Sequence, residues 1–318
     1  MKLAHMAVVT PRRCGLYETT RELVVALRAI GVDSRIIDPQ PTNLHPGGTD
    51  DRGAVFADTA WAHGADFLIN HSGLGKELDA SDIPVIHMAH GRPRSTFLTE
   101  RDGGPPVVSY HYSKDKDPRF KAVITFWPEH VRYLQVMFTE TPVHCITAPV
   151  DLDAWSPGGP SGYAFHGKKG PINVVIADAW RSDIDPFEAV CAFAHFARST
   201  PAKLHLYGGH LKEKAWPALL RKLRDQDSLG EFQGWVSGLD NVYRAADMLI
   251  TPHTIAVRSI REALACGCPV VRGISDIDNA VSAMRHSQTR QNARREAEVM
   301  YNPADTAREF MDIVNGCS

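Results

Sequence analysis

The stretch from Ala246 to Gly273 constrains the fold more than any other part of the sequence. An apolar run at 248–251 has the composition of a buried parallel strand. A helix is predicted from about Val257, and Gly267 ends it just before a second apolar strand begins. This order of elements is typical of doubly wound α/β domains. The positive end of such a helix favours a phosphate, although an ordinary αβ unit shows the same pattern.

The N-terminal half has the same alternation of apolar strands and polar loops. Several predicted strands end in loops rich in His, Asn and Gly, which in a parallel sheet form the edge where ligands bind. The first turn has a single glycine, Gly15, so no dinucleotide fingerprint is present. The strands are predicted at 3–9, 32–37, 67–70, 85–88, 107–110 and 122–125, with a helix at 16–29.

A second α/β series follows a change of composition. Residues 148–171 hold four prolines and five glycines without helical periodicity, which indicates an interdomain linker. Near the end of the chain, Asn302 is a suitable cap for a helix whose first residue is Pro303. Besides the elements between Ala246 and Gly273, strands are predicted at 173–177, 203–207 and 231–233, and helices at 186–197, 212–226, 239–246 and 303–314.

Composition excludes some classes of protein. Apolar residues at 43% and charged residues at 23% are typical of a soluble globular chain, and the net charge of −2 predicts no global attraction to nucleic acid or anionic membrane. No apolar run approaches the roughly 20 residues that a membrane span needs. Six scattered cysteines favour reduced thiols and a cytoplasmic setting. The glycine that ends the predicted helix explains Cys266-Gly-Cys268 better than a metal site does.

An ordered set of motifs resembles the GT-B glycosyltransferases, and most closely the retaining family 4, or glycosyl transferases group 1. The most specific motif is Arg261-Glu-Ala-Leu-Ala-Cys-Gly-Cys-Pro-Val-Val271. The others are the strand, Gly15 and helix at the N-terminus, Pro149–Pro157, Leu206–Gly209, Phe232–Val236 and Tyr243–Asp247.

The resemblance implies an α/β fold of two Rossmann-like doubly wound domains facing across a cleft. It implies an enzyme that moves a hexosyl or pentosyl group from a nucleotide-diphosphate sugar, for example a UDP-sugar, to an acceptor hydroxyl with retention. The acidic residues considered below indicate no metal, and no other cofactor is predicted. The domains would be 1–150 for acceptor binding, 151–170 as linker, 171–300 for nucleotide-sugar binding, and 301–318 as a C-terminal helix.

The donor residues are implied by the same resemblance. Glu262 would accept hydrogen bonds from the ribose diol, and Arg181 would hold the diphosphate and take part in catalysis. Backbone N–H groups at 255–257 would meet the phosphates or the sugar. The full donor set is Gly15, Arg181, Gly208, Gly209, Trp235, Val236, His253, Thr254, Ile255, Ala256, Val257, Arg258 and Glu262.

Two departures from the family pattern concern this site. Thr254 stands where the family has the first of two paired glutamates, and no lysine follows shortly after Arg181. Our hypothesis is that Arg258 or His253 supplies the missing positive charge. Asp183 and Asp185 resemble a metal motif of another glycosyltransferase fold, but carboxylates at a predicted helix start are better explained as partners of the helix dipole.

On the acceptor side, His87 and His90 are candidate catalytic residues, because a neutral imidazole donates to a sugar hydroxyl or moves a proton near pH 7. The segment 92–121 interleaves basic and aromatic residues, which suits a phosphorylated or DNA acceptor, although a solvated loop of mixed charge has the same composition. Its candidate acceptor-binding residues are Arg92, Arg94, Tyr112, Lys114 and Lys116.

Three alternatives stay open. The acceptor is either a carbohydrate or small molecule, or a hydroxymethylated base in DNA, as for a phage-type DNA glycosyltransferase that must reach or flip the base. A nucleotide-sugar epimerase is a rival within the same fold. A non-catalytic binding module is the third alternative, which the departures at Thr254 and after Arg181 would favour.

Overall fold

The computed structural model describes residues 1–7, 15–38, 48–90, 114–159, 170–178, 186–208, 217–234, 236–253, 255–272 and 287–317. The chain divides into two compact units, of which the first comprises Met1–Pro149 with Tyr301–Ser318 and the second Val150–Met300. Each unit is built around one parallel sheet with helices, which confirms the predicted α/β fold with two doubly wound domains.

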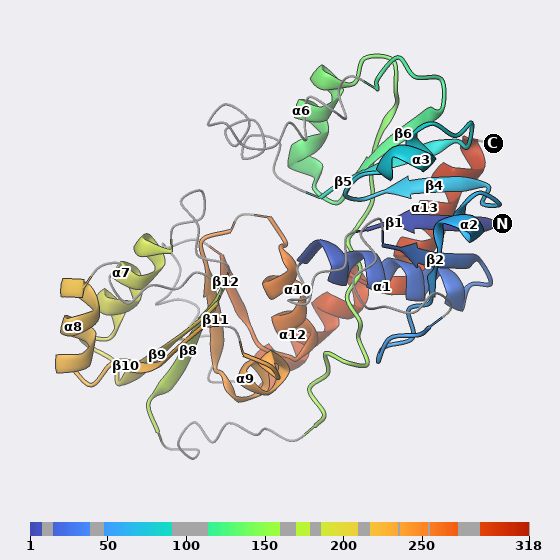
Figure 1. Ribbon diagram of the computed structural model, residues 1–318. Coiled ribbons are helices and arrows are strands. Elements are labelled where there is room, and N and C mark those ends of the chain that lie inside the picture. Colours follow the sequence, from blue (N-terminus) through green and yellow to red (C-terminus); the bar gives the residue numbers. More distant parts are fainter. Residues whose placement is uncertain are drawn as a thin grey trace. The chain divides into compact units, whose positions relative to one another are not determined.

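In the described residues of the first unit, seven parallel strands form a sheet in the order β3-β2-β1-β4-β5-β6-β7 (Figure 1). The strand β1 lies between β2 and β4, so the chain runs first to one side of β1 and then to the other. The elements of this unit are β1 Lys2–Met6, α1 Gly15–Ala29, β2 Asp33–Ile37, β3 Phe56–Ala57, α2 Thr59–Ala62, β4 Phe67–Asn70, α3 Gly75–Asp79, β5 Val85–Ala89, β6 Phe120–Thr125, α6 Pro128–Met137, β7 Val143–Cys145 and α13 Pro303–Gly316.

The C-terminal helix α13 belongs to this first unit and packs against α1 (Figure 1). Phe310 and Val314 are fully buried in a cluster with Leu23 and Leu27 of α1 and with side chains of the central strands. The helix begins as predicted, because the Asn302 side chain accepts a hydrogen bond from the N–H of Ala304 at 2.9 Å. The last helix of the chain therefore completes the core that the N-terminal strands begin.

In the described part of the second unit, five parallel strands are ordered β10-β9-β8-β11-β12 (Figure 1). Here β8 is the central strand, with β9 paired on one side and β11 on the other. The elements are β8 Ile172–Ala177, α7 Phe187–Phe196, β9 Ala202–Tyr207, α8 Pro217–Asp225, β10 Leu229–Gln233, α9 Leu239–Ala245, β11 Met248–Thr251, α10 Arg258–Ala265, β12 Val270–Arg272 and α12 Ser287–Met300.

Most predicted helices and strands are confirmed. They include the strand, helix and strand predicted between Ala246 and Gly273. The helix α10 ends just before Gly267, which adopts the left-handed conformation with φ 72°. Two long helices were missed. The helix α6 buries His130, Leu134 and Met137, so its helical period was present in the sequence. By contrast α12 is polar on most of its surface, and only two of its alanines are buried among the described side chains, which leaves no apolar stripe to recognise. The strand predicted at 107–110 lies outside the described residues.

A core substitution tests the role of α13. Phe310→Ala is expected to lower the free energy of unfolding by about 3–5 kcal/mol, because it removes a fully buried ring and leaves a cavity. Asp312→Ala, on the exposed side of the same helix, should change it by less than about 0.5 kcal/mol. Urea denaturation followed by circular dichroism measures both. Equal, small effects would show that α13 does not complete the core.

Candidate active site

The carboxyl ends of β8 and β11 meet at the switch point of the second sheet. Asp178 directly follows β8 and His253 follows β11, and the Asp178 Oδ2 and His253 Nε2 atoms are in direct contact across the two strand ends. His253 is buried, at 2% exposed, and the backbone N–H of Asp178 also donates to the carbonyl of Tyr207 in β9. Three neighbouring strand ends are thus tied together where ligands of such sheets bind.

The helix α10 begins beside these strand ends. Val257 is its N-cap and provides no side-chain cap, so helix geometry leaves the N–H groups of Arg258 and Ser259 without intrahelical acceptors. The N–H of Val257 already donates to the carbonyl of Ile255 at 2.8 Å. The positive end of α10 therefore offers donors to an anion mainly from its first turn and less from Val257.

Glu262 lies one turn further along α10, where its carboxylate pairs with the guanidinium of Arg258. Its side chain is 4% exposed. The Cζ atom of Arg258 lies 5.9 Å from the centroid of the Trp155 ring, and that ring lies 6.2 Å from the ring of Tyr243. Burial, and then the charge of Glu262, raise the pKa of the Tyr243 phenol well above its usual range. A buried carboxylate is thus paired with one cation, which in turn lies near the ring of Trp155.

These contacts bear on the proposed substitute for the missing lysine. Both candidates already face a carboxylate inside the protein, since Arg258 pairs with Glu262 and the His253 ring contacts Asp178. A diphosphate at the N-terminus of α10 would meet Arg258 only in competition with Glu262. Whether either side chain replaces the lysine stays a prediction.

The other predicted donor residues are placed only in part. Gly208 follows β9 with φ 141°, which strongly favours glycine, and its N–H donates to the carbonyl of Gly234 at 3.1 Å. Val236 and Ala256 are half-buried, and Ile255 is buried. Four further predictions, Arg181, Gly209, Trp235 and Thr254, lie outside the described residues.

In the first unit, the carboxyl ends of β1, β4 and β5 are neighbours. Gly15, the first residue of α1, is exposed, and a Cβ atom built on it would meet no described atom within 4 Å. The loop after β4 carries His71, and His90 directly follows β5. This edge therefore joins an open helix start to two histidines, of which the sequence analysis had singled out only His90.

A continuous chain of imidazole rings lies behind this edge. His5 Nδ1 and His71 Nε2 are 3.0 Å apart, and His71 Nδ1 and His90 Nε2 are 2.6 Å apart. The hydroxyl of Thr20 in α1 is 3.0 Å from the same Nδ1 atom of His71. Burial lowers the pKa of His5 to about 3, and burial followed by the neighbouring histidines lowers the pKa of His71 well below its usual range. These two rings are neutral at physiological pH.

The structure separates the two histidines that the sequence favoured equally. His87 lies within β5, is 6% exposed, and its Nδ1 atom lies 3.2 Å from the carbonyl oxygen of Asn70, to which it donates. His90 is half-buried at the strand end, its carbonyl accepts from the Trp127 indole, and its ring lies against Phe126. His90 is therefore better placed to reach a ligand than His87.

The predicted acceptor-binding lysines lie elsewhere. Lys114 pairs with Asp79 at 3.1 Å, and Asp115 accepts hydrogen bonds from backbone N–H groups at 139–141, so this segment is fixed to the loops that precede β5 and β7. Those loops are at the amino edge of the sheet, opposite His90. Lys114 and the exposed Lys116 are thus not brought together with His90. The remaining candidates, Arg92, Arg94 and Tyr112, lie outside the described residues.

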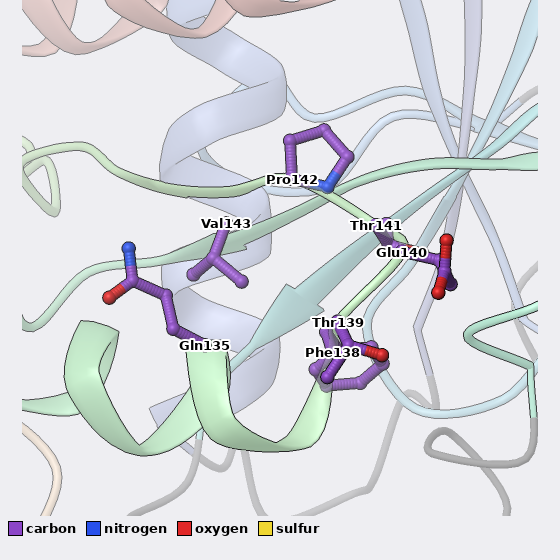
Figure 2. Close-up of a pocket in the computed structure, with 7 residues that line it drawn as sticks. All are labelled: Gln135, Phe138, Thr139, Glu140, Thr141, Pro142 and Val143. Carbon is purple, nitrogen blue, oxygen red and sulfur yellow. The ribbon is translucent and has the colours of Figure 1, made fainter.

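A depression of about 470 Å³ lies between the end of α6 and the start of β7 (Figure 2). It is also at the amino edge, because the loop that lines it leads from a helix into a strand. It therefore does not adjoin the strand ends that carry His71 and His90. Its lining residues are Gln135, Phe138, Thr139, Glu140, Thr141, Pro142 and Val143.

Residues 187–315 match the family model described as Glycosyl transferases group 1. The chain carries a Glycosyl transferases group 1 domain. That match includes α10, Glu262 and the strand end at His253. No curated protein sequence matches the chain.

Solved structures support the same fold over the whole length. A glycosyltransferase from Rickettsia africae has a TM-score of 0.67 at 14% identity, covering 99% of this chain and 98% of that one. Anabaena HepE, in complex with UDP and glucose, has a TM-score of 0.66 at 13% identity, covering 99% and 100%. An alpha-glucosyltransferase in complex with UDP and a 13-mer DNA containing an HMU base has a TM-score of 0.67 at 10% identity, covering 99% of both chains. The fold is that of the GT-B glycosyltransferases.

Two kinds of feature are absent from the described residues. No helix there has the length and apolar character that crossing a membrane requires. Among the same residues, no three His, Cys, Asp or Glu side chains are grouped so as to hold a metal ion.

Three residues of these sites escaped the sequence analysis. Asp178 was visible only as the first acidic residue after a predicted strand, and His71 lay in a His-containing strand-end loop without being singled out as a candidate. Trp155 lay in the predicted linker, where no periodicity indicated that its ring would be buried. For Asp178 and His71 the useful signal was a position just after a predicted strand. For Trp155 it was a position inside the motif Pro149–Pro157.

The pair formed by Arg258 and Glu262 can be measured directly. Arg258→Ala is expected to reduce the free energy of unfolding by about 3 kcal/mol, because it removes the cation beside a buried carboxylate. Adding Glu262→Gln to that variant should recover part of the loss. A double-mutant cycle by urea denaturation should give a coupling energy of about 1–3 kcal/mol. Additive effects of the two substitutions would contradict a direct interaction.

Proposed function

We propose that this protein transfers a hexosyl or pentosyl group from a nucleoside-diphosphate sugar to an acceptor hydroxyl, with retention of configuration. One observation carries the proposal. The switch point of the second sheet, inside the segment that matches the group 1 family, combines the positive end of α10 with the buried carboxylate of Glu262. This combination suits a ligand that has a diphosphate and a ribose diol.

In the proposed complex, the diphosphate lies against the first turn of α10 and the ribose hydroxyls donate to Glu262. Arg258 then turns from the carboxylate towards the phosphates, so that binding replaces one ion pair by another. Arg181, Gly209, Trp235 and Thr254 keep their predicted roles in this complex. Uridine is the base we favour, because UDP is bound in the structure of Anabaena HepE.

On the acceptor side, a neutral His90 would hydrogen-bond a hydroxyl of the transferred sugar, with the helix start at Gly15 nearby in the same sheet edge. The departing diphosphate would take the proton of the acceptor hydroxyl, since no carboxylate nucleophile is predicted. We propose further that no metal ion is needed, because helix dipole and arginine stabilise the leaving charge.

The acceptor is proposed to be a carbohydrate or small molecule. A hydroxymethylated base in DNA is the second candidate, and one observation favours it: a similar fold occurs in the alpha-glucosyltransferase with DNA containing an HMU base. The basic segment after His90 is compatible with both.

A thermal-shift panel of UDP, GDP, ADP, CDP and dTDP in the presence of EDTA tests the donor site. One nucleotide at about 100 times its dissociation constant should add about 2.7 kcal/mol and raise the midpoint by several degrees. Glu262→Ala should abolish that shift, because the ribose loses its acceptor. Glu296→Ala, an exposed carboxylate of the same unit, should leave it unchanged.

The outcomes separate the rival functions. If no nucleotide raised the melting midpoint, the proposed donor site would be contradicted. A rise in the midpoint that occurred only without EDTA would contradict the proposal that no metal is needed. With the sugar form of the stabilising nucleotide, an epimerase would give a sugar isomer without acceptor. Binding without any turnover would favour the non-catalytic module.

Gel shift with duplex DNA tests the second acceptor. If DNA binds along the carboxyl edge, Arg92→Ala with Arg94→Ala should weaken binding, and Lys114→Ala with Lys116→Ala, at the opposite edge, should not. Three phosphate contacts predict a loss of about 40-fold between 50 and 200 mM salt. Absence of a gel shift at low salt would exclude DNA as the acceptor. If the two lysine substitutions weakened binding and the two arginine substitutions did not, the DNA-binding surface would instead be the amino edge of the sheet.

A further inference from the structure

The chain His5–His71–His90 is the feature that the proposed function leaves unexplained. It joins three elements of the first unit: His5 in β1, His71 after β4 and His90 after β5. The backbone holds the central ring, because the N–H of His71 donates to the carbonyl of Met6 at 3.0 Å. The loop then turns back through a hydrogen bond from the N–H of Gly73 to the Asn70 side chain at 2.7 Å. The backbone on both sides of the His71 Cα atom is thus held in place.

The direction of the hydrogen bonds follows from Thr20. Its hydroxyl donates its single hydrogen to the carbonyl of Leu16 at 3.0 Å, so towards His71 it acts as an acceptor. His71 therefore carries its proton on Nδ1, which faces both Thr20 and His90. Because His71 is neutral, its Nε2 atom accepts from Nδ1 of His5. The same Nδ1–H of His71 points at Nε2 of His90, which must accept it.

The inner end of the chain is closed. The Nε2 atom of His5 is buried and has no hydrogen-bond partner among the described residues, and the ring lies near Phe310. A proton passed inwards from His90 would have to end on this atom, in apolar surroundings that do not stabilise it. The arrangement therefore does not conduct protons through the core. It is a fixed template whose outer end is His90.

We propose that His71 is a positioning residue that sets the tautomer of His90, with Nε2 as hydrogen-bond acceptor from His71 and the ring proton on Nδ1. His90 would then present an N–H donor, and not a lone pair, from its Nδ1 atom. The inference rests on the proposed function only for the claim that this donor meets the transferred sugar. The tautomer itself is a property of the unliganded protein.

The surroundings of His71 support a neutral chain. The titratable groups that face it are His5 from β1, His87 from β5 and His90, and Thr20 is its partner from α1. No carboxylate is among the described groups that interact with it, so nothing stabilises an imidazolium at this position. A proton on Nε2 of His90 would also oppose the N–H of His71. Both effects favour the same tautomer.

Two substitutions by amide side chains each keep one hydrogen-bonding position of the His71 ring and remove the other. The amide of asparagine reaches the position of Nδ1, so His71→Asn keeps a donor for His90 and Thr20 but loses the contact with His5. The amide of glutamine reaches the position of Nε2, so His71→Gln keeps an acceptor for His5 but loses the donor for His90. His63→Gln, at a half-exposed histidine of the same unit, is the control.

The experiment is long-range proton–nitrogen NMR of the full chain labelled with nitrogen-15 histidine, with His90→Gln to assign the His90 signals. In the wild type and in His71→Asn, His90 should carry its proton on Nδ1 near pH 7. In His71→Gln, an Nε2–H form should appear. A wild-type His90 protonated on Nε2, or an unchanged tautomer in His71→Gln, would overturn the proposal whether or not a donor is known.

Kinetics test the link to the site. With the sugar donor that the wild type turns over, His71→Gln should lower kcat by about 10-fold to 100-fold, as loss of an orienting partner does for histidines that bind metals, with little change in the KM of the donor. His71→Asn should restore most of kcat. Equal losses in both variants would indicate a purely structural role. If the wild type turns over no donor, the proposed function fails and the NMR result still decides the tautomer.

Discussion

Parallel pairing around one central strand in each unit is the constraint on which both candidate sites depend. In the second unit, Met248 pairs with Val174 and Leu249 with Val175, so β8 and β11 end at the same level and Asp178 meets His253. In the first unit, Met6 pairs with Asn70 and Asn70 with His87, so His71 and His90 follow strands that end at the same edge of the sheet. The ladders satisfy the strand backbones, which leaves the loops at the carboxyl edge free to carry chemistry.

The buried carboxylate of the candidate donor site is compensated by a neighbouring cation. Removing a carboxylate such as that of Glu262 from water is costly unless a cation is close, and Arg258 supplies one from the preceding turn. The carboxylate of Asp178 likewise meets the imidazole of His253. A nucleotide that binds here therefore competes with internal partners. Its affinity depends on the difference between two ion pairs rather than on a free charge.

The sequence predicted the fold well where local signals coincide with the parallel sheet. Gly267, Pro269 and the apolar strands around α10 are such signals, and so is Asn302 before α13. It failed at α12, where a helix packs through two small side chains, and it could not tell His87 from His90, because both follow the same apolar strand pattern. It also grouped Lys114 with His90 on the acceptor side, since distance along the chain does not tell which edge of a sheet a segment reaches.

The histidine chain shows why such a site resists prediction from sequence. His5 looks like one polar residue within an apolar strand, and its neutral burial is unfavourable on its own. Because its folded pKa is lowered to about 3, the unfolded chain binds a proton that the folded one does not, and acid below the ordinary histidine pKa favours unfolding. Burial of His71 acts in the same direction. The free energy of unfolding therefore falls in acid. The fold tolerates this loss because the two rings, with Thr20, leave His90 a single orientation for its proton. That requirement appears only when four separate segments of the chain are brought together.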